Sequence, residues 1–331
     1  MATVITSTAL CPADDTGSAI AYAASAGSAC LQQAGLAPAD VDVLINVGVY
    51  RDSNISEPSI AALIQKRIGI NLDYLHAADR RSAFSFDLMN GACGVLNAVQ
   101  AGGALLAAGN AHRVLVVSAD THPSMNTAKA GTAEFPYAST GAALLLERTD
   151  DAGGFGRVHH RSLPGSPGVN GYVPLDEVGA EGRNSIAVDR DGDVLERMLD
   201  LAVDSVRDCL TAEHGADAAA SPASLDRTLL VTSQPSPDFA SRLAKRLGLA
   251  SDAAVTVEGL DGDPHTSALA YGFRQAQDAG RLAGHDRVLF LAVGAGLTSA
   301  ASLYRLTGEQ TGDMSGAAAR ALSGDAEGAA R

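Results

Sequence analysis

The order of expected secondary-structure elements repeats once along this chain, and that repeat limits the folds it can adopt. Short apolar segments rich in β-branched residues are typical of buried strands, and they alternate with longer segments of helical periodicity. Each half is expected to run approximately strand, helix, strand, helix, strand, helix, strand, strand. The two halves share little sequence identity, so this prediction depends on the element order alone. We therefore predict a duplicated α/β fold.

The expected elements of both halves are bounded by turn-forming residues and by glycine or proline near helix ends. In the first half, strands are expected at 2–10, 41–49, 84–89, 113–119 and 141–147, and helices at 18–34, 58–68 and 95–106. In the second half, strands are expected at 156–160, 228–232, 255–258, 288–293 and 299–304, and helices at 194–212, 237–247 and 264–280. The glycine- and proline-rich segment 163–183 is expected to be a surface loop.

A polar, glycine-rich break at 150–156 separates the halves. We therefore divide the chain into an N-terminal half, 1–150, and a C-terminal half, 151–308. The tail 309–331 is rich in glycine, alanine and acidic residues and is expected to be disordered.

Composition excludes several function classes. The net charge of −14 argues against nucleic acid and against an anionic membrane surface as partners. No apolar run is long enough to span a bilayer, and no signal peptide is recognised at the N-terminus. The four cysteines are scattered, without the spacing of a metal site, which favours a reducing compartment. We expect a cytoplasmic protein with no metal and no permanently bound cofactor.

The segment 84–94, Phe-Ser-Phe-Asp-Leu-Met-Asn-Gly-Ala-Cys-Gly, is the first candidate for chemistry. It is expected to place Cys93 where a strand turns into the N-terminus of an apolar helix. Free N–H groups at such a helix start favour the thiolate and lower the pKa of a thiol. Small neighbours would let a substrate carbonyl approach the sulfur. The alternative is a buried structural cysteine.

In this context the chain resembles the thiolase-fold condensing enzymes, specifically β-ketoacyl-ACP synthase III and its relatives. The resemblance covers roughly residues 18–306 and is carried best by 86–94, 113–120, 243–249 and 293–298. It implies a duplicated thiolase-like fold with α-β-α-β-α layers. It also implies a homodimer with the strand at 114–118 as its edge.

The resemblance assigns roles to two parts of the chain. Cys93 would attack an acyl-CoA or acyl-ACP thioester and hold the acyl group. The main-chain N–H groups of Cys93 and Ala295 would form the oxyanion hole, with Gly294 and Gly296 beside the substrate. The alternative for 294–296 is a simple turn between two strands.

Two departures from the family pattern affect the expected chemistry. Ser233 stands where the family has a histidine. An ungapped match puts Asp263 at the position of the family's asparagine, and a small gap puts His265 there instead. The histidine and asparagine normally donate hydrogen bonds to a malonyl thioester carbonyl, which Ser233 and an ionised Asp263 cannot do in the same way. Ordinary decarboxylative elongation is therefore not expected. Asp263-Pro264 is equally readable as a helix start.

The sequence Ser56-Glu57-Pro58-Ser59 resembles a turn of HMG-CoA synthases and of enzymes that join two acyl chains without decarboxylation. In those enzymes the glutamate removes the α-proton of the second substrate, and in the chain-joining enzymes it comes from the neighbouring subunit. Glu57 is the corresponding candidate here. The alternative is a glutamate favoured by the dipole at a helix start.

The family's early Trp/Arg segment for CoA has no counterpart, and the chain has no tryptophan. This favours an acyl group carried on the phosphopantetheine of ACP, with CoA as the other carrier. Because this chain is itself acidic, binding an acyl carrier protein would require a local patch of arginines on its surface. The candidates, which are also readable as solvated surface, are Arg67, Arg80, Arg81, Arg242 and Arg246.

These residues predict an acyltransferase that forms an acyl-Cys93 thioester. The expected second step is a Claisen-type carbon–carbon condensation in specialised metabolism, assisted by Glu57. One alternative transfers the acyl group to oxygen or nitrogen, with His265 or Asp263 as base. Another is a non-catalytic partner subunit of a ketosynthase heterodimer, whose signature would be a missing nucleophile.

Overall fold

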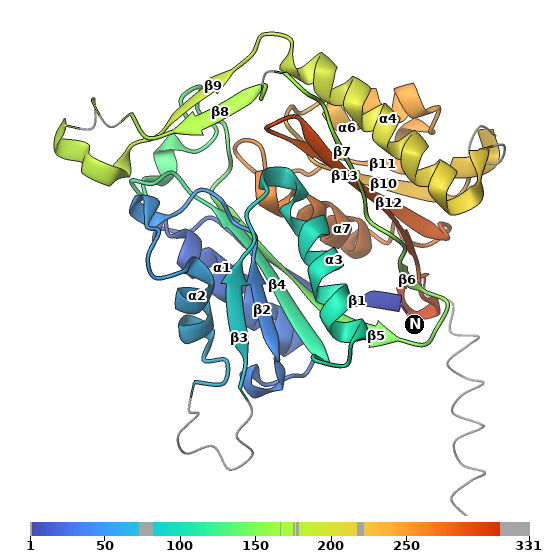
Figure 1. The fold of residues 1–331 in the computed structure, drawn as a ribbon, viewed down its shortest axis with the longest axis horizontal. Helices are drawn as coiled ribbons and strands as arrows, with labels where there is room; N and C mark the ends of the chain where they lie inside the picture. The colour runs from blue at the N-terminus through green and yellow to red at the C-terminus, as the bar shows by residue number, and fades with distance from the viewer. Residues whose placement is uncertain are drawn as a thin grey trace, which may run out of the picture.

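Two halves with the same strand order build the fold, as a computed structural model of the chain shows (Figure 1). The structure describes residues 2–72, 82–165, 167–174, 176, 179–216 and 222–311. The strand order is β3-β2-β4-β5-β1 in the first half and β11-β10-β12-β13-β7 in the second. In each half the first three strands of this order run parallel to one another, and each of the last two strands runs antiparallel to the strand before it. The expected duplication is confirmed.

The first half contains β1 (Ala2–Pro12), α1 (Ala19–Gln33), β2 (Val43–Asn46), α2 (Ile60–Ile68), β3 (Phe84–Asp87), α3 (Gly94–Ala107), β4 (Arg113–Asp120) and β5 (Thr140–Thr149). Its 3-10 turns are η1 (Pro38–Asp40), η2 (Asp52–Asn54), η3 (Gly91–Cys93) and η4 (Thr127–Lys129).

The second half contains β6 (Gly154–Phe155), β7 (His159–Ser162), β8 (Val169–Tyr172), β9 (Ala187–Arg190), α4 (Val194–His214), β10 (Thr228–Thr232), α6 (Phe239–Leu247), β11 (Ala254–Val255), α7 (Ala268–Asp278), β12 (Arg287–Gly294), β13 (Thr298–Arg305) and α8 (Gly308–Thr311). Its 3-10 turns are η5 (Gly179–Asn184), η6 (Pro222–Leu225), η7 (Ser251–Ala253) and η8 (His265–Ser267).

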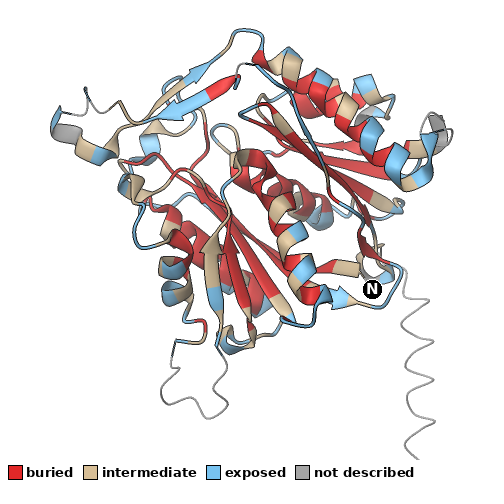
Figure 2. Cartoon of the chain, viewed as in Figure 1, coloured by how far each residue is buried: buried red, intermediate tan, exposed pale blue. Residues whose placement is uncertain are grey.

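The helices divide into three layers separated by the two halves of the sheet. Apolar residues of α3 and α7 form one core with the inner faces of both halves. Helices α1 and α2 cover the outer face of the first half, and α4 and α6 cover that of the second. Figure 2 shows the buried residues concentrated in the strands and on α3 and α7. The layering is therefore α-β-α-β-α, as the resemblance implies.

A short strand joins the two halves into one hydrogen-bonded path. Phe155 in β6 pairs with Thr3 in β1 and with Tyr304 in β13. The side chain of Gln310 adds to this seam, because its Nε2 donates to the main-chain oxygen of Ile5 at 3.2 Å. The break expected at 150–156 is thus crossed by strand pairing, and the domain division made there stays a prediction.

Helix α1 lies very close to β5. A Cβ atom added at Gly141 would come within 2.7 Å of the main-chain carbon of Tyr22. The backbone of Gly141 has no positive φ, so contact with the helix is what requires glycine at this position. The residue therefore sets the spacing between α1 and the sheet.

The segment 163–183 differs from the expected loop. It contains β8, which pairs antiparallel with β9 in a separate two-stranded sheet. The residues of this segment are mostly turn formers with few consecutive apolar residues, so its sequence does not predict a strand. Several expected elements are also shorter than predicted. For example, β2 covers only Val43–Asn46 of the expected strand 41–49, β11 has two residues, and the helix expected from residue 264 begins at Ala268 after η8.

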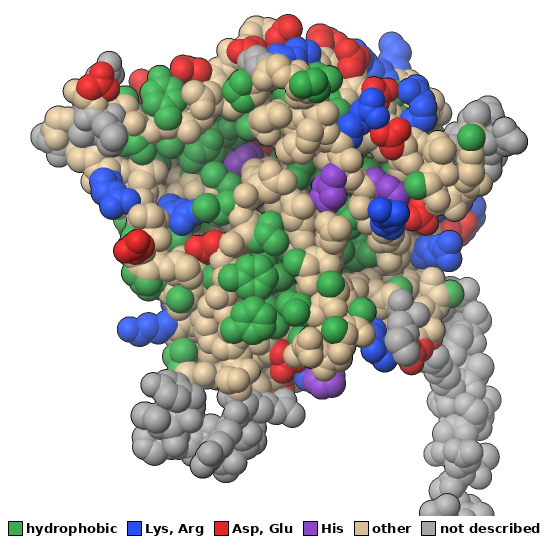
Figure 3. Space-filling view, viewed as in Figure 1, with side chains coloured by type: hydrophobic (Ala, Val, Ile, Leu, Met, Phe, Trp, Pro, Cys, Tyr) green, Lys and Arg blue, Asp and Glu red, His purple; other side chains and the backbone are tan. Residues whose placement is uncertain are grey.

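The free edge of the first half is β3 and not the strand at 114–118. That strand lies inside β4, which pairs with β5 on one side and with β2 on the other. Strand β3 ends the strand path, and the Phe84 side chain on it is 53% exposed. Figure 3 shows apolar side chains gathered on the face of the molecule that carries β3. The expectation that 114–118 forms a dimer edge is therefore wrong.

No helix in the described part of the chain is long and apolar enough to cross a membrane. Within those same residues no group of three or more histidine, cysteine or acidic side chains could hold a metal ion. The tail expected from residue 309 begins with the last residues of α8, and residues 312–331 lie outside the described residues.

Candidate active site

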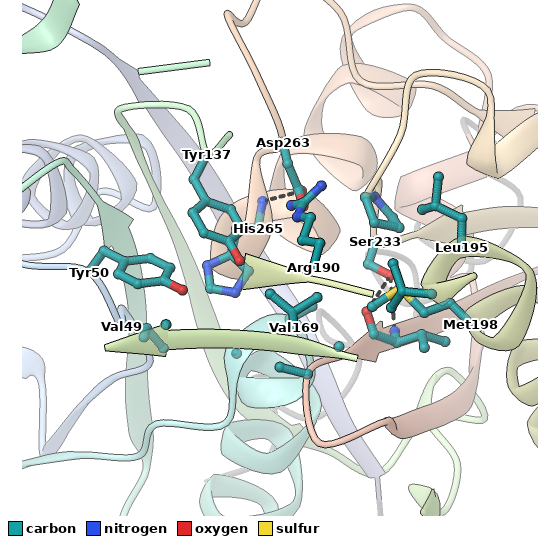
Figure 4. A pocket seen from close by; sticks show the side chains of 18 residues that line it. Val49, Tyr50, Tyr137, Val169, Arg190, Leu195, Met198, Ser233, Asp263 and His265 are labelled. Atoms are coloured by element: carbon teal, nitrogen blue, oxygen red, sulfur yellow. Dashed lines mark hydrogen bonds between the residues drawn. The ribbon is translucent and has the colours of Figure 1, made fainter. Parts of the chain in front are cut away.

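A cavity of about 150 Å³ opens where the two halves meet, beneath the β8–β9 hairpin (Figure 4). Most of its wall is apolar, with polar groups gathered around His265 and Ser233 (Figure 4). The lining residues are Val49, Tyr50, Gly91, Ala92, Tyr137, Val169, Gly171, Arg190, Val194, Leu195, Met198, Ser233, Pro235, Asp263, His265, Val293, Gly294 and Ala295.

Asp120, at the carboxyl end of β4, holds His265 from behind. Its carboxylate is fully buried and accepts hydrogen bonds from the N–H groups of Val49 at 3.0 Å and Tyr50 at 2.8 Å. The other oxygen, Oδ2, accepts from the N–H of Thr266 and lies 3.1 Å from His265 Nδ1. Asp120 thereby ties the first half of the chain to the start of α7 in the second.

Burial and charge act in opposite directions on this pair. Burial alone would raise the pKa of Asp120, but the adjacent His265 and the hydrogen bonds leave that pKa below its usual range. Burial alone would lower the pKa of His265, but the Asp120 carboxylate raises it above its usual range. The pair is therefore stabilised as imidazolium and carboxylate.

The backbone and the aromatic neighbours of His265 fix its ring in the cavity wall. Its φ is 46°, a left-handed conformation that side chains other than glycine rarely adopt. The Asp263 carboxylate stabilises this turn by accepting from the His265 N–H at 2.8 Å. The imidazole lies against Tyr137, with ring centroids 4.4 Å apart. Its Nε2 is directed towards Gly91, where an added Cβ would be only 3.4 Å from that nitrogen.

Cys93 does not line this cavity. Its side chain is fully buried, and its Sγ lies 3.6 Å from the main-chain oxygens of Ala292 and of Thr298 in the hairpin formed by β12 and β13. Burial raises the pKa of the Cys93 thiol to about 12. The expectation that the helix start lowers this pKa is wrong, because the thiolate would lose its solvation in the core. This geometry does not favour Cys93 as a nucleophile.

The neighbouring residue, Ala92, faces the cavity instead. A Cβ added at Gly294 would lie 3.5 Å from the main-chain nitrogen of Ala92, so the end of β12 packs against this residue. The N–H of Cys93 donates to the oxygen of Asn90 at 3.0 Å, which closes the η3 turn. That N–H is therefore already used and does not suit the expected oxyanion hole.

Segment 86–163 matches the family model of 3-oxoacyl-[acyl-carrier-protein (ACP)] synthase III. The chain is 29% identical over 281 residues to a β-ketoacyl-[acyl-carrier-protein] synthase III of Streptomyces coelicolor, covering 83% of this chain and 76% of that protein. It is 25% identical over 302 residues to the synthase III of Koribacter versatilis, covering 86% and 82%.

Solved structures of similar fold include proteins of the same kind as these relatives. Synthase III from Pseudomonas aeruginosa matches with a TM-score of 0.70 and 19% identity, covering 92% of this chain and 98% of that one. OleA from Xanthomonas campestris, solved with bound lauric acid and lauroyl-CoA, matches with a TM-score of 0.71 and 17% identity, covering 92% and 99%. This chain is similar to synthase III proteins over most of its length, and it has the fold of the synthase III structures. The relationship supports an acyl-transferring condensing enzyme.

Several residues expected at the synthase III-like site do line the cavity, namely Ser233, Asp263, His265, Gly294 and Ala295. Burial raises the pKa of Asp263, although the charge of His265 opposes this. Ser233 is committed to the backbone: its Oγ donates to the oxygen of Val293 at 3.2 Å and accepts from the N–H of Val293 at 3.0 Å. It therefore braces β10 against β12.

Other expected residues lie elsewhere in the synthase III-like fold. The N–H of Gly296 donates to the main-chain oxygen of Pro167. This hydrogen bond holds the turn between β12 and β13 against the segment that precedes β8. Arg242 and Arg246 form ion pairs with Glu196 on α4, and Arg246 also pairs with Asp200. These pairs neutralise both arginines between α6 and α4, so neither is presented to a substrate in this cavity.

Two further sets of expected residues lie away from the cavity or outside the described structure. Glu57 and Arg67 are exposed on the surface near α2. Arg80 and Arg81 lie outside the described residues. Glu57 is therefore not positioned to act in the cavity of its own chain.

The sequence did not reveal four cavity or supporting residues. Tyr50 and Tyr137 stack with centroids 4.6 Å apart, and the Arg190 guanidinium lies 5.6 Å from the centroid of Tyr137. Of the four, only Asp120 could have been found from the sequence, because a carboxylate at the end of an otherwise apolar strand is unusual. Arg190 could not have been found, because it lies on the hairpin that the sequence did not predict.

Proposed function

We propose that this protein transfers an acyl group from a thioester, carried on the phosphopantetheine of ACP or on CoA, to an oxygen or nitrogen nucleophile. The observation that carries the proposal is the pairing of His265 with Asp120 at the cavity wall, where His265 Nε2 faces Gly91. A histidine held from behind by a carboxylate is suited to accept the proton of a hydroxyl or amine.

The rest of the cavity supports this role. Apolar residues from the hairpin and from α4, such as Val169, Leu195 and Met198, provide a wall for the acyl group. Its volume of about 150 Å³ favours a short chain or a single ring. Specialised metabolism remains our expectation for the pathway.

Transfer to a carbon nucleophile is less well supported. It requires a base for the α-proton, and the candidate Glu57 is exposed and outside the cavity. Malonyl decarboxylation is also expected to be feeble, because the Ser233 hydroxyl is engaged by Val293.

The test uses the purified full chain with butyryl-CoA as donor and hydroxylamine as a nitrogen nucleophile. Chromatography measures released CoA, and mass spectrometry measures the hydroxamate. We expect the rate above background to fall by about a hundredfold or more in His265→Gln, because the base is removed. The control is His112→Gln, at an exposed histidine far from the cavity wall. Equal loss in both variants, or no loss in His265→Gln, would contradict the proposal.

A second candidate function is a non-catalytic partner subunit of a ketosynthase. The observation that favours it is Ala92, whose methyl group faces the cavity beside the main-chain turn at Gly294. In that case the chain alone would release no CoA from any donor. It would instead raise the activity of a ketosynthase with which it co-purifies.

A further inference from the structure

We infer that the acyl group passes directly from the carrier thioester to the acceptor, without an acyl-enzyme, and that Ala92 occupies the place where an enzyme nucleophile would stand. The inference rests on the proposed function and specifies how its transfer step occurs. It predicts a complex that holds donor and acceptor together, in contrast to an acyl-Cys93 intermediate.

The first observation is the orientation of two consecutive residues in η3. In a 3-10 turn, consecutive side chains point about 120° apart, so only one of the two can face a given direction. Ala92 lines the cavity, whereas the Cys93 thiol is directed at the oxygens of Ala292 and Thr298 in the core. To bring the Cys93 thiol into the cavity, the backbone of η3 would have to change conformation.

The second observation concerns main-chain donors. The Cys93 N–H is taken by Asn90, but no hydrogen bond of the Ala92 N–H is found within the described residues. Ala92 and the turn containing Ala295 line the cavity, and His265 Nε2 faces Gly91, the residue next to Ala92. The donor carbonyl is therefore expected to point its oxygen at Ala92, one residue before the position that the resemblance assigned.

The transfer step balances without an enzyme nucleophile. His265 Nε2 takes the proton from the acceptor hydroxyl or amine, and the acceptor atom forms a bond to the thioester carbonyl carbon. The main-chain N–H groups stabilise the resulting oxyanion. The carbon–sulfur bond then breaks, and the departing thiolate takes the proton back from His265. The products are an ester or amide and the free thiol of the carrier.

The experiment moves a thiol by one residue. Wild type, Cys93→Ala, Ala92→Cys and the double variant Ala92→Cys/Cys93→Ala are incubated with butyryl-CoA, and intact-protein mass spectrometry with peptide mapping locates any acyl group. We expect no stable adduct on wild type, unchanged turnover in Cys93→Ala, and one acyl group at residue 92 in both variants that carry Ala92→Cys. Iodoacetamide is expected to alkylate the same position in those variants.

The outcomes separate this inference from the proposed function. An acyl adduct on wild type that disappears in Cys93→Ala would overturn the inference, even if His265 is still required. Failure of Ala92→Cys to react with iodoacetamide in folded protein, checked by its circular dichroism spectrum, would also overturn it. Wild type without turnover, combined with acylated Ala92→Cys, would sustain the position of the donor carbonyl and refute the proposed transfer function.

Discussion

Asp120 and His265 make activity and stability depend on pH at the scale of single residues. The Asp120 carboxylate raises the pKa of His265 above the ordinary value of 6.5. A general base acts in its unprotonated form, so turnover should rise with pH through a limb centred above pH 6.5. The stability that the raised pKa of His265 contributes is fully present below pH 6.5 and is lost as pH rises through the folded pKa of His265. Rate profiles from pH 5 to 9 would measure the first effect, and urea unfolding over that range the second.

The positioning role of Asp120 is tested by Asp120→Asn. Without the carboxylate charge, burial should lower the pKa of His265, so the acidic limb of the rate profile should move to lower pH while turnover falls. The free energy of unfolding should decrease by about 3 kcal/mol, as expected when one partner of a buried ion pair is removed. A lower rate with an unmoved limb would mean that Asp120 only supports the fold.

At this scale the sequence named several residues that line the cavity, and the roles assigned to them stay predictions. The resemblance named Ser233, Asp263 and His265, and all three line the cavity. Cys93 does not line the cavity whereas Ala92 does, because a shift of one residue in a 3-10 turn changes which side chain faces a given direction. Nothing in the letters Gly-Ala-Cys-Gly distinguishes the two cases.

At the scale of elements, the periodic segments were predictable and the irregular ones were not. The segment 228–232, which is rich in apolar and β-branched residues, forms β10 with the expected bounds, because all five of its residues are buried. The hairpin of β8 and β9 has half-exposed strands with little alternation, so its pairing is decided by tertiary contacts. One such contact is the approach of Gly171 to Tyr50, where an added Cβ would lie 2.7 Å from the tyrosine oxygen.

The spacing between α1 and β5 gives a prediction at the scale of elements. Gly141→Ala would force the added methyl group into the backbone of Tyr22, so the free energy of unfolding should fall by about 1–3 kcal/mol. Gly192→Ala is the matched control, because an added Cβ there meets nothing within 4 Å and φ is not positive. Urea unfolding of both variants measures the difference, and equal effects would show that α1 adjusts without cost.

At the scale of the whole molecule, the free edge at β3 is where we expect a second copy to bind. Its main-chain groups are available for pairing, and Phe84 and Phe86 stack there with centroids 5.8 Å apart. Helix α2 lies beside β3, so such a dimer would bring Glu57 towards the second copy. This is the arrangement in which Glu57 retains a role.

The dimer is tested by Phe84→Asp, which places a charge on the edge. Sedimentation velocity should show wild type as a dimer and Phe84→Asp as a monomer. Leu163→Asp provides the control, because Leu163 is 39% exposed at the end of β7, away from this edge. A dimer that persists in Phe84→Asp would place the contact elsewhere.

Helices α3 and α7 occupy equivalent places in the two halves, so the turns that precede them, η3 and η8, are equivalent as well and lie against each other. In terms of gene duplication, a half-length ancestor that paired with itself would have brought two copies of one helix start together. That ancestor would already have possessed a cavity with twofold symmetry. Divergence of the fused copies would then explain why one helix start now offers the main-chain N–H of Ala92 and the other offers an imidazole at His265.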